Sequence, residues 1–380
     1  MEQYTEYELG AICSRLSSGK GISARNITDE GEYPVYGGNG LRGYTGTCNF
    51  DGDCAIIGRQ GAFCGNVRYF NGQAYMTEHA VVCCANEEHN TRYLAYLLSR
   101  MNLGRLSGQS AQPGLSVKTL SKQIVRMPSL EQQKKVVSVL SALDAKNASN
   151  EKINDNLQQQ LRAIFRAEFT DNPQLEKLAQ IPLAKLCHTV TKGTTPTTLG
   201  KPFVESGINY IKAESILDDH SIDKSKFTFI DEETNDLLKR SIIRAGDVVF
   251  TIAGTLGRFA LIDDNVLPAN TNQAVAIIRA DVDKVLPEYI YSCFIGGWHT
   301  DYYAKRVQQA VQANLSLTTI KSLPIPLLDE AKMSEYLSLI LPLIKAIKAN
   351  EAQNEKLAAL RDNLLPKLMS GEIDVSDIQL

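Results

Sequence analysis

The sequence predicts an α+β protein in which two pseudo-symmetric α/β modules are separated by two long antiparallel coiled-coil helices. One observation behind this fold class is an internal repeat at an offset of 200 residues. Another is that short β-type runs and Gly-rich turns are confined to 1–128 and 171–326, whereas 129–170 and 327–369 are long amphipathic stretches. The predicted segments are therefore a first module (1–128), a helix (129–170), a second module (171–326), and a helix with a tail (327–380).

The internal repeat covers both the modules and the helices. The matched segments are 111–120 (AQPGLSVKTL) with 311–320 (VQANLSLTTI), 150–157 (NEKINDNL) with 350–357 (NEAQNEKL), and, more weakly, Gly52-Asp53 with Gly246-Asp247 and the Gly-rich turns that follow them. A repeated unit of this length contains one module and one helix. Half of the chain is therefore a diverged copy of the other half.

Each predicted helix carries a coiled-coil seam, in which steps of four and three residues alternate. The seam is apolar at its start, at Val136 and Tyr336, and apolar again at its end. Its middle is rich in asparagine, with Asn147, Asn150 and Asn154 in the first helix and Asn350 and Asn354 in the second. If the helices pair antiparallel, these asparagines meet at the centre, where they cost stability but fix the register.

The length of these helices favours pairing with each other. A helix of about 36 residues spans about 54 Å, which is longer than one small domain needs. The alternative is that each helix packs separately on its own module. Because each helix starts at its module and ends far from it, antiparallel pairing would hold the two modules at opposite ends of a rod. Such a rod suits a target with two half-sites, such as duplex DNA, in which one face repeats about every 34 Å.

Composition excludes several classes of protein. The chain has 40 Lys and Arg against 43 Asp and Glu, a formal net charge of −3, which argues against a polybasic binder, although the net charge of a whole chain can hide a basic face. It has no apolar run long enough for a membrane span and no signal-peptide pattern, so we expect a cytoplasmic protein. The eight cysteines contain no CxxC pair and are expected to be free thiols, with no metal site. A zinc site at Cys48, Cys54, Cys64 and His79 is the less favoured alternative.

The beginnings and ends of the helices resemble those of a known family. Residues 130–134 (LEQQK), 328–330 (LDE) and especially 360–375 (LRDNLLPKLMSGEIDV) are similar to the DNA-specificity (S) subunit of type I restriction-modification systems. The resemblance extends over essentially the whole chain. It implies a non-catalytic subunit without a cofactor of its own, whose two modules are target recognition domains that each read one part of a split double-stranded DNA sequence.

The resemblance also implies partner subunits. Two adenine methyltransferase subunits, which bind S-adenosylmethionine, would dock on the helices, and ATP-dependent translocase/endonuclease subunits would join them for cleavage. Because the two modules have diverged so far, we expect their half-sites to differ and the target to be asymmetric. The first module has 12 basic and 11 acidic residues and the second has 16 and 18, so attraction to phosphate must come from local clusters.

Candidate DNA contacts lie mainly in Gly-rich turns, where the backbone approaches phosphate closely and a long side chain can enter a groove. In the first module they are Lys20, Tyr36, Asn39, Arg42, Tyr44, Arg59, Gln60, Arg68, Gln109 and Gln112. In the second they are Lys192, Thr194, Thr195, Lys212, Thr255, Arg258, Asn272, Gln273, Gln309 and Gln312. Arg59 and Arg258 stand in comparable turns and suit guanine, whereas Gln60, Asn272 and Gln273 suit adenine. For each residue the alternative is an ordinary turn or surface position.

The sequence predicts no catalytic residues. Gly19-Lys20 lacks the pattern of a phosphate-binding loop, and the Asn/Asp-Pro-Pro-aromatic motif of amino-methyltransferases does not occur. The acidic-Lys pair of Glu330 and Lys332 has no carboxylate at the matching Gln132, so a helix first turn is favoured there. The rival to a DNA reader is a coiled-coil adaptor whose two modules bind proteins. A stand-alone enzyme is disfavoured by the missing motifs.

Overall fold

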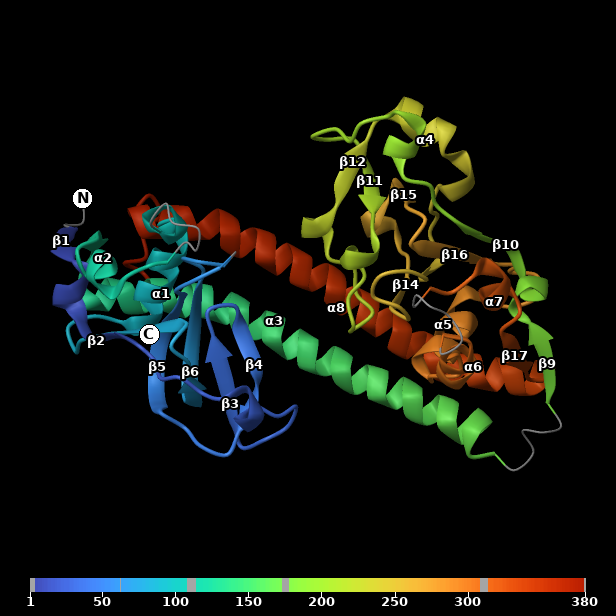
Figure 1. Ribbon diagram of the computed structural model, residues 1–380, viewed down its shortest axis with the longest axis horizontal. Helices are drawn as coiled ribbons and strands as arrows, with labels where there is room; N and C mark the ends of the chain where they lie inside the picture. The colour runs from blue at the N-terminus through green and yellow to red at the C-terminus, as the bar shows by residue number, and fades with distance from the viewer. Residues whose placement is uncertain (1–3, 62, 108–113, 173–177, 308–313, 379–380) are drawn as a thin grey trace. The chain divides into compact units, whose positions relative to one another are not determined.

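The computed structural model describes residues 4–61, 63–107, 114–172, 178–307 and 314–378. The chain divides into two compact units, Met1–Lys146 with Leu357–Leu380, and Asn147–Lys356. Both divisions fall inside the long helices α3 (Leu130–Phe165) and α8 (Glu330–Ser370) (Figure 1). Each unit therefore contains one module and part of both helices. The four segments expected from the sequence, which separate helices from modules, stay a prediction.

The first module is built on a six-stranded sheet in the order β2-β7-β5-β6-β3-β4. Its strands are β2 (Cys13–Ser18), β3 (Tyr33–Gly37), β4 (Gly40–Thr45), β5 (Phe50–Gly58), β6 (Val67–Met76) and β7 (Ala80–Ala85). Neighbouring strands are antiparallel except β3 and β6, which are parallel. Side chains alternate between the two faces of the sheet, and both faces are buried. Ile57 packs with α1 (Thr91–Arg100) in one core, and its neighbour Ile56 packs in a second core on the other face.

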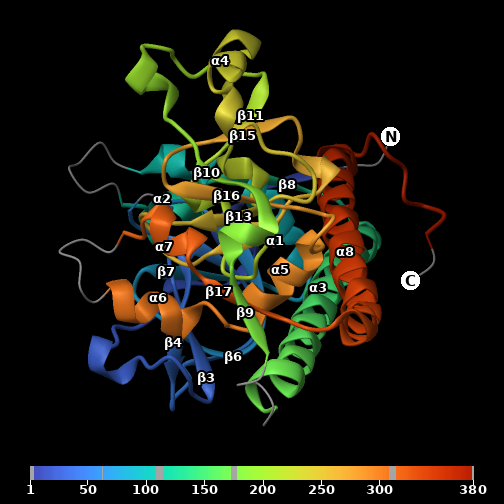
Figure 2. The same cartoon turned by 90° about the vertical axis from the view of Figure 1, so that its right-hand side faces the viewer.

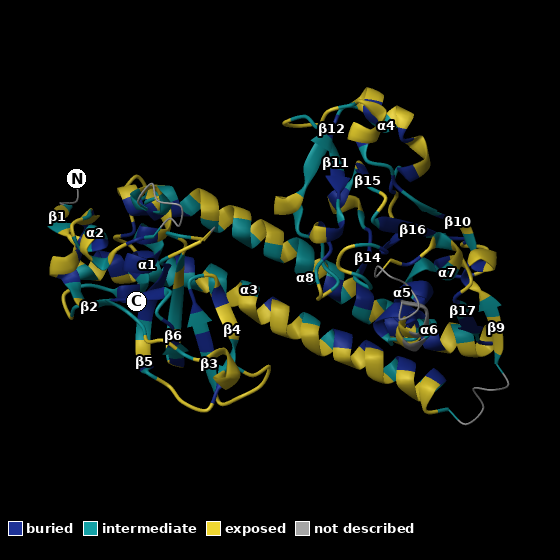
Figure 3. Cartoon of the chain, in the orientation of Figure 1, coloured by how far each residue is buried: buried dark blue, intermediate teal, exposed yellow. Residues whose placement is uncertain are grey.

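The second module contains two smaller sheets in place of the single sheet of the first, with strand orders β10-β16-β13-β14 and β12-β11-β15. The strands are β10 (Cys187–Lys192), β11 (Ile208–Ile211), β12 (Thr228–Ile230), β13 (Val248–Thr251), β14 (Phe259–Leu261), β15 (Ala269–Thr271) and β16 (Val275–Ala280). Its helices are α4 (Glu232–Leu237), α5 (Pro287–Ile295) and α6 (Thr300–Val307). Figure 2 shows β10, β16 and β13 next to one another in the middle of this module, and Figure 3 shows buried residues along β16 and α5.

The internal repeat is confirmed by matching elements in the two units. A two-stranded antiparallel ribbon joins β1 (Thr5–Glu8) to β8 (Ile124–Met127), and its counterpart joins β9 (Ala179–Pro182) to β17 (Pro324–Leu327). Before each ribbon's last strand lies a short helix, α2 (Val117–Ser121) or α7 (Leu317–Lys321). Both helices begin with the same cap, in which the Ser116 or Ser316 hydroxyl accepts a hydrogen bond of 3.0 Å from the backbone N–H three residues on. The matched segments therefore fold alike.

The two long helices pair antiparallel, as the seam predicts. In the Asn147–Lys356 unit, the Asn150 amide donates to Oδ1 of Asn354 (2.7 Å) and the Asn350 amide donates to Oδ1 of Asn154 (2.8 Å). Residues further along α3 therefore contact residues earlier in α8, as in an antiparallel pair. Asn147 is partly buried and its Oδ1 atom has no hydrogen-bond partner. The alternative in which the helices pack separately does not hold.

The described residues contain no helix that is long and apolar enough to cross a membrane. All eight cysteines are free thiols, at positions 13, 48, 54, 64, 83, 84, 187 and 293. Within the same described parts of the chain, no group of three or more His, Cys, Asp or Glu side chains is placed to hold a metal ion.

Candidate nucleic-acid interface

Three turns of the first module meet at one edge of its sheet. The backbone N–H of Gly19 donates to the Ala80 carbonyl (3.0 Å), and that of Arg59 donates to the His79 carbonyl (3.0 Å). A Cβ placed on Gly38 would lie only 2.8 Å from the same His79 carbonyl oxygen, so this position needs glycine. The turn between β6 and β7 therefore gathers the segments that carry Lys20, Asn39 and Arg59.

Basic side chains flank these turns. A Cβ on Gly37 would lie 2.7 Å from Cδ of Arg42, and one on Gly40 would lie 3.0 Å from Nη1 of Arg68, so both arginines cross the tip of the β3–β4 hairpin. We call Lys20, Arg42, Arg59 and Arg68 the basic turn cluster. Arg59 is half-buried, with Nη1 3.5 Å from the Ser18 hydroxyl, and the other three are exposed. The cluster offers four cations in a module that is not basic overall.

The polar and aromatic candidates of the first module surround this cluster. Asn39 and Gln60 are exposed, and Gln60 forms an isolated β-bridge with Gly114. Tyr36 is partly buried against Phe70, with ring centroids 5.0 Å apart. Burial raises the pKa of Tyr36, and the positive charge of Arg68 opposes this shift. Tyr44 is also partly buried, and its backbone pairs with Thr28, so it contributes to the hairpin more than to the exposed edge.

In the second module, two candidate segments are joined directly. The Gly193 N–H donates to the Asn272 carbonyl (3.1 Å), and the Thr195 hydroxyl donates to the Gln273 side chain. A Cβ on Gly193 would lie 1.7 Å from the Thr271 carbonyl oxygen, so only glycine fits there. The segment that carries Lys192 and Thr194 therefore lies against the segment that carries Asn272.

Two further basic residues of this module are Lys212 and Arg240, and of these Arg240 contacts the joined segments. Lys212 follows β11, and its Nζ lies 5.1 Å from the centre of the Phe203 ring and 4.0 Å from Oε1 of Glu214. Arg240, which the sequence prediction missed, reaches the Thr194 hydroxyl with Nη2 at 3.4 Å. The neighbouring pair Lys239-Arg240 is a local basic signal that could have indicated it.

The turn after β5 and the turn after β13 are comparable, as predicted, but their arginines occupy opposite ends. Arg59 directly follows β5, and its carbonyl accepts from Leu115 N–H (2.8 Å), as the Ile252 carbonyl accepts from Leu315 (2.9 Å). Arg258 instead ends its turn, where its carbonyl accepts a hydrogen bond from Thr251 N–H (2.8 Å). Arg59 therefore corresponds to Ile252 and not to Arg258.

The Arg258 guanidinium is engaged within the module. It forms two bonds of 2.6 Å to the carboxylate oxygens of Asp218 and a third of 3.2 Å to the Ile216 carbonyl. An arginine bound in this way has few donors left for a guanine. Thr255 lies exposed in the same turn, and its carbonyl accepts from the Thr251 hydroxyl. The remaining amide candidates, Gln109, Gln112, Gln309 and Gln312, lie outside the described residues.

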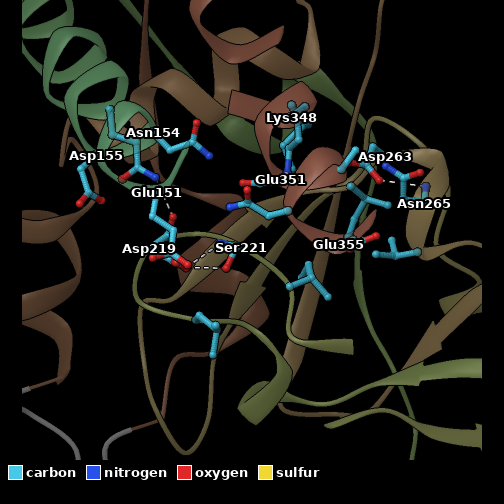
Figure 4. Close-up of a pocket in the computed structure, with 18 residues that line it drawn as sticks. Glu151, Asn154, Asp155, Asp219, Ser221, Asp263, Asn265, Lys348, Glu351 and Glu355 are labelled. Atoms are coloured by element: carbon cyan, nitrogen blue, oxygen red, sulfur yellow. Dashed lines mark hydrogen bonds and ion pairs between the residues drawn. The ribbon is translucent and has the colours of Figure 1, made fainter. Parts of the chain in front are cut away.

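The second unit also contains an acidic cavity of about 280 Å³ (Figure 4). Its lining includes Glu151, Asp155, Asp219, Asp263, Glu351 and Glu355, with Lys348 as the one cation. Burial raises the pKa of the Glu351 carboxyl, while Lys348, at 2.8 Å, opposes this. An acidic lining repels phosphate, so the cavity is not part of the nucleic-acid interface. Gln158, whose amide donates to the Asp219 carbonyl (2.7 Å), instead ties α3 to the second module here.

Comparison with known proteins places this geometry in a family. The model of the type I restriction modification DNA specificity domain matches residues 1–159 and 178–358. The specificity subunit of the type I restriction enzyme EcoprrI from Escherichia coli is 42% identical over 140 residues, which are 36% of this chain and 35% of that protein. The chain thus matches only about a third of that relative's length. The MjaIX specificity subunit from Methanocaldococcus jannaschii is 24% identical over 313 residues, 76% of this chain and 70% of the relative.

The fold has a counterpart among solved structures. The type-I restriction-modification system S subunit from M. genitalium superimposes with a TM-score of 0.59 at 15% identity, covering 97% of this chain and 96% of that one. This likeness concerns the fold alone, whereas the family model matches both halves of the sequence. The chain therefore belongs to the type I restriction modification DNA specificity family.

Proposed function

We propose that this chain is the non-catalytic subunit that selects the DNA target of a type I restriction-modification complex, and that it reads an asymmetric bipartite sequence in double-stranded DNA. The observation that carries the proposal is the gathering of candidate side chains from separate turns in each module of a chain that matches the specificity family in both halves. Cations there bind phosphate, and amide and guanidinium groups read base edges.

The asymmetry of the target follows from the different chemistry of the two modules. The first module presents Arg42, Arg59 and Arg68 around the hairpin tip. The second module presents Thr195 and Gln273 joined side chain to side chain, and its turn arginine is engaged by Asp218. Arginine favours guanine and amides favour adenine, so the two modules suit different half-sites. The antiparallel helix pair would set the unread spacer between them.

The chain would act with partners in the cytoplasm. Two adenine methyltransferase subunits would dock on the helices and methylate the target, and ATP-dependent translocase/endonuclease subunits would join for cleavage. The long exposed faces of α3 and α8 offer docking surfaces for such subunits (Figure 3). The residues that read DNA are the basic turn cluster, Asn39 and Gln60 in the first module and Lys192, Thr194, Thr195, Lys212, Asn272 and Gln273 in the second.

Sequencing of modified bases in genomic DNA tests the proposal. The strain with the intact gene should carry methyladenine in one split motif with unequal halves, and deletion of the gene should remove that methylation. Complementation with the wild-type gene should restore it. An unchanged methylation pattern in the deletion strain would overturn the proposal and favour the coiled-coil adaptor, which requires no sequence-dependent DNA binding.

A further inference from the structure

The seam between the helices is polar in the unit that contains the first module. Asp144 of α3 lies between two arginines, with Nη2 of Arg92 at 3.2 Å and Nη1 of Arg361 at 3.4 Å from its carboxylate oxygens. The Tyr96 hydroxyl also donates to this carboxylate. All four side chains are partly buried. The pair formed by Asp144 and Arg361 is the part of this network that joins α3 to α8.

The internal repeat gives these two seam positions apolar counterparts in the other unit. At the offset of 200 residues, Ile344 corresponds to Asp144 and Leu161 corresponds to Arg361. Both belong to the hydrophobic core of the Asn147–Lys356 unit, where Ile344 is 3% exposed and Leu161 is fully buried. The same layer of the seam is thus an ion pair in one unit and a buried apolar pair in the other.

The last turns of the two helices differ in the same way. Phe165 of α3 packs on Gly296 so closely that a Cβ there would lie 2.1 Å from the ring. The Phe169 ring lies 5.4 Å from the ring of Tyr336, centre to centre. The counterparts of Phe165 and Phe169 in α8 are Leu365 and Met369, which lie in the core of the other unit. The end of α3 is therefore suited to the core of the Asn147–Lys356 unit, and the end of α8 is suited to the core of the other unit.

We infer that Asp144 and Arg361 restrict α3 to pairing with α8 and exclude pairing of either helix with the like helix of a second copy. In a pair of two α3 helices, Asp144 would face Leu161 of the second copy. In a pair of two α8 helices, Arg361 would replace Leu161 in a fully buried apolar layer and face Ile344. Each charge would lose its partner across the seam and much of its hydration, although Asp144 would keep Arg92 and Arg361 would keep Asp362, which lies 2.8 Å away on the same helix.

The central asparagines do not provide this selection. Because Asn154 is the counterpart of Asn354, an α3 helix paired with a second α3 would still match Asn150 with Asn154. Within the seam, the charged layer distinguishes the two partners, and the different helix ends add to this distinction. Its effect is to keep two different modules in one recognition unit, since like pairing would bring together two identical modules. The inference concerns assembly and stands or falls independently of the proposed function.

A cleavable full-length chain tests the inference. A site for a sequence-specific protease, inserted between Asn172 and Leu178, lets the purified protein be cut into two fragments that remain paired through their helices. Fragments that carry different tags are then mixed, and their pairs are counted by native mass spectrometry. The parent protein should give pairs of unlike fragments only. The double variant D144I/R361L, which copies the apolar layer of the other unit, should raise like pairs by about tenfold or more.

Single variants make the outcome more specific. R361L should permit like pairs of the fragment that contains α8, but not of the fragment that contains α3. D144I should do the reverse. D155N, which changes an exposed carboxylate of α3 outside the charged layer, should behave like the parent and serves as the matched control. Circular dichroism establishes that each variant is folded. The inference would be overturned if the parent protein formed like pairs, or if every folded variant still formed unlike pairs only.

Discussion

Asn150 of α3 donates a hydrogen bond of 2.7 Å to Oδ1 of Asn354 in α8. The equivalent residues of the internal repeat form a second bond, in which Asn350 donates to Oδ1 of Asn154 at 2.8 Å. Asn150 is fully buried and also donates to Oε1 of Gln353 (2.8 Å). Buried amides that need each other can be satisfied in one alignment of the helices only. This layer therefore fixes the register of the helix pair.

We expect Asn150→Leu to lower the free energy of unfolding by about 1–3 kcal/mol, because it leaves the partly buried side-chain oxygen of Asn354 without its donor. Asn150→Leu with Asn354→Leu should recover part of this loss, since no polar group is then stranded. Guanidinium denaturation measures both. Asn156→Leu, on an exposed position of α3, is the control and should change stability by less than about 0.5 kcal/mol. An equal loss in all three variants would contradict a specific role for the asparagine layer.

Arg59→Ala should weaken DNA binding, whereas Arg258→Ala should lower the stability of the fold. Arg59 lies in the basic turn cluster, and its guanidinium has one weak contact within the protein, at 3.5 Å from the Ser18 hydroxyl. Its removal should therefore weaken binding to the target duplex by about tenfold and leave the free energy of unfolding unchanged. Arg258 is bound by Asp218, so its removal should cost up to about 1 kcal/mol of stability and leave binding nearly unchanged. Fluorescence anisotropy and thermal denaturation separate the two. Weaker binding on loss of Arg258 with unaltered stability would assign that arginine to DNA instead.

Gly193→Ala should disrupt the joined segments of the second module. The new methyl group would lie 1.7 Å from the Thr271 carbonyl oxygen, so the backbone must move and the contact between Thr195 and Gln273 is lost. We expect the free energy of unfolding to fall by more than about 2 kcal/mol. Gly46→Ala, where a Cβ has open space, should be neutral. Thermal denaturation that finds the two variants equally stable would show that the close approach at Gly193 is not required.

Acid should destabilise the second unit through two histidines. Burial lowers the pKa of His220 to about 4, helped by the positive charge of Arg162, and burial also lowers that of His299 to about 4. Between pH 6.5 and about 4 the unfolded chain binds protons that the folded chain does not, so stability falls as the pH falls. The loss is at most about 3 kcal/mol per histidine. His299→Phe should flatten the stability profile relative to the parent, and identical slopes would contradict this.

The helix pair could be predicted from the sequence because a coiled-coil seam depends on local spacing. Val136, Asn150 and Leu161 repeat at intervals that a reader can count, and the structure places all three in buried positions. The repeat likewise predicted that the two modules share one plan, which the equivalent caps at Ser116 and Ser316 confirm.

The site was harder to predict because its contacts join distant parts of the chain. Asp218, which engages Arg258, lies 40 residues from it, and Arg240 reaches Thr194 across 46 residues. Neither contact has a periodic signal. The turns after β5 and β13 could be matched by their glycines, but Arg59 is the first residue of its turn and Arg258 the last of the other, so the two arginines are not counterparts.

Exchange of the first module, followed by sequencing of methylated bases, tests the central claim most directly. Residues 1–128 are replaced by the equivalent module of a relative, and the methylated motif is compared with that of the parent. A chain with two independent readers predicts that one half of the motif changes while the other half and the spacer stay the same. A motif that stays unchanged, or one that changes in both halves, would contradict the claim that each module reads its own half-site.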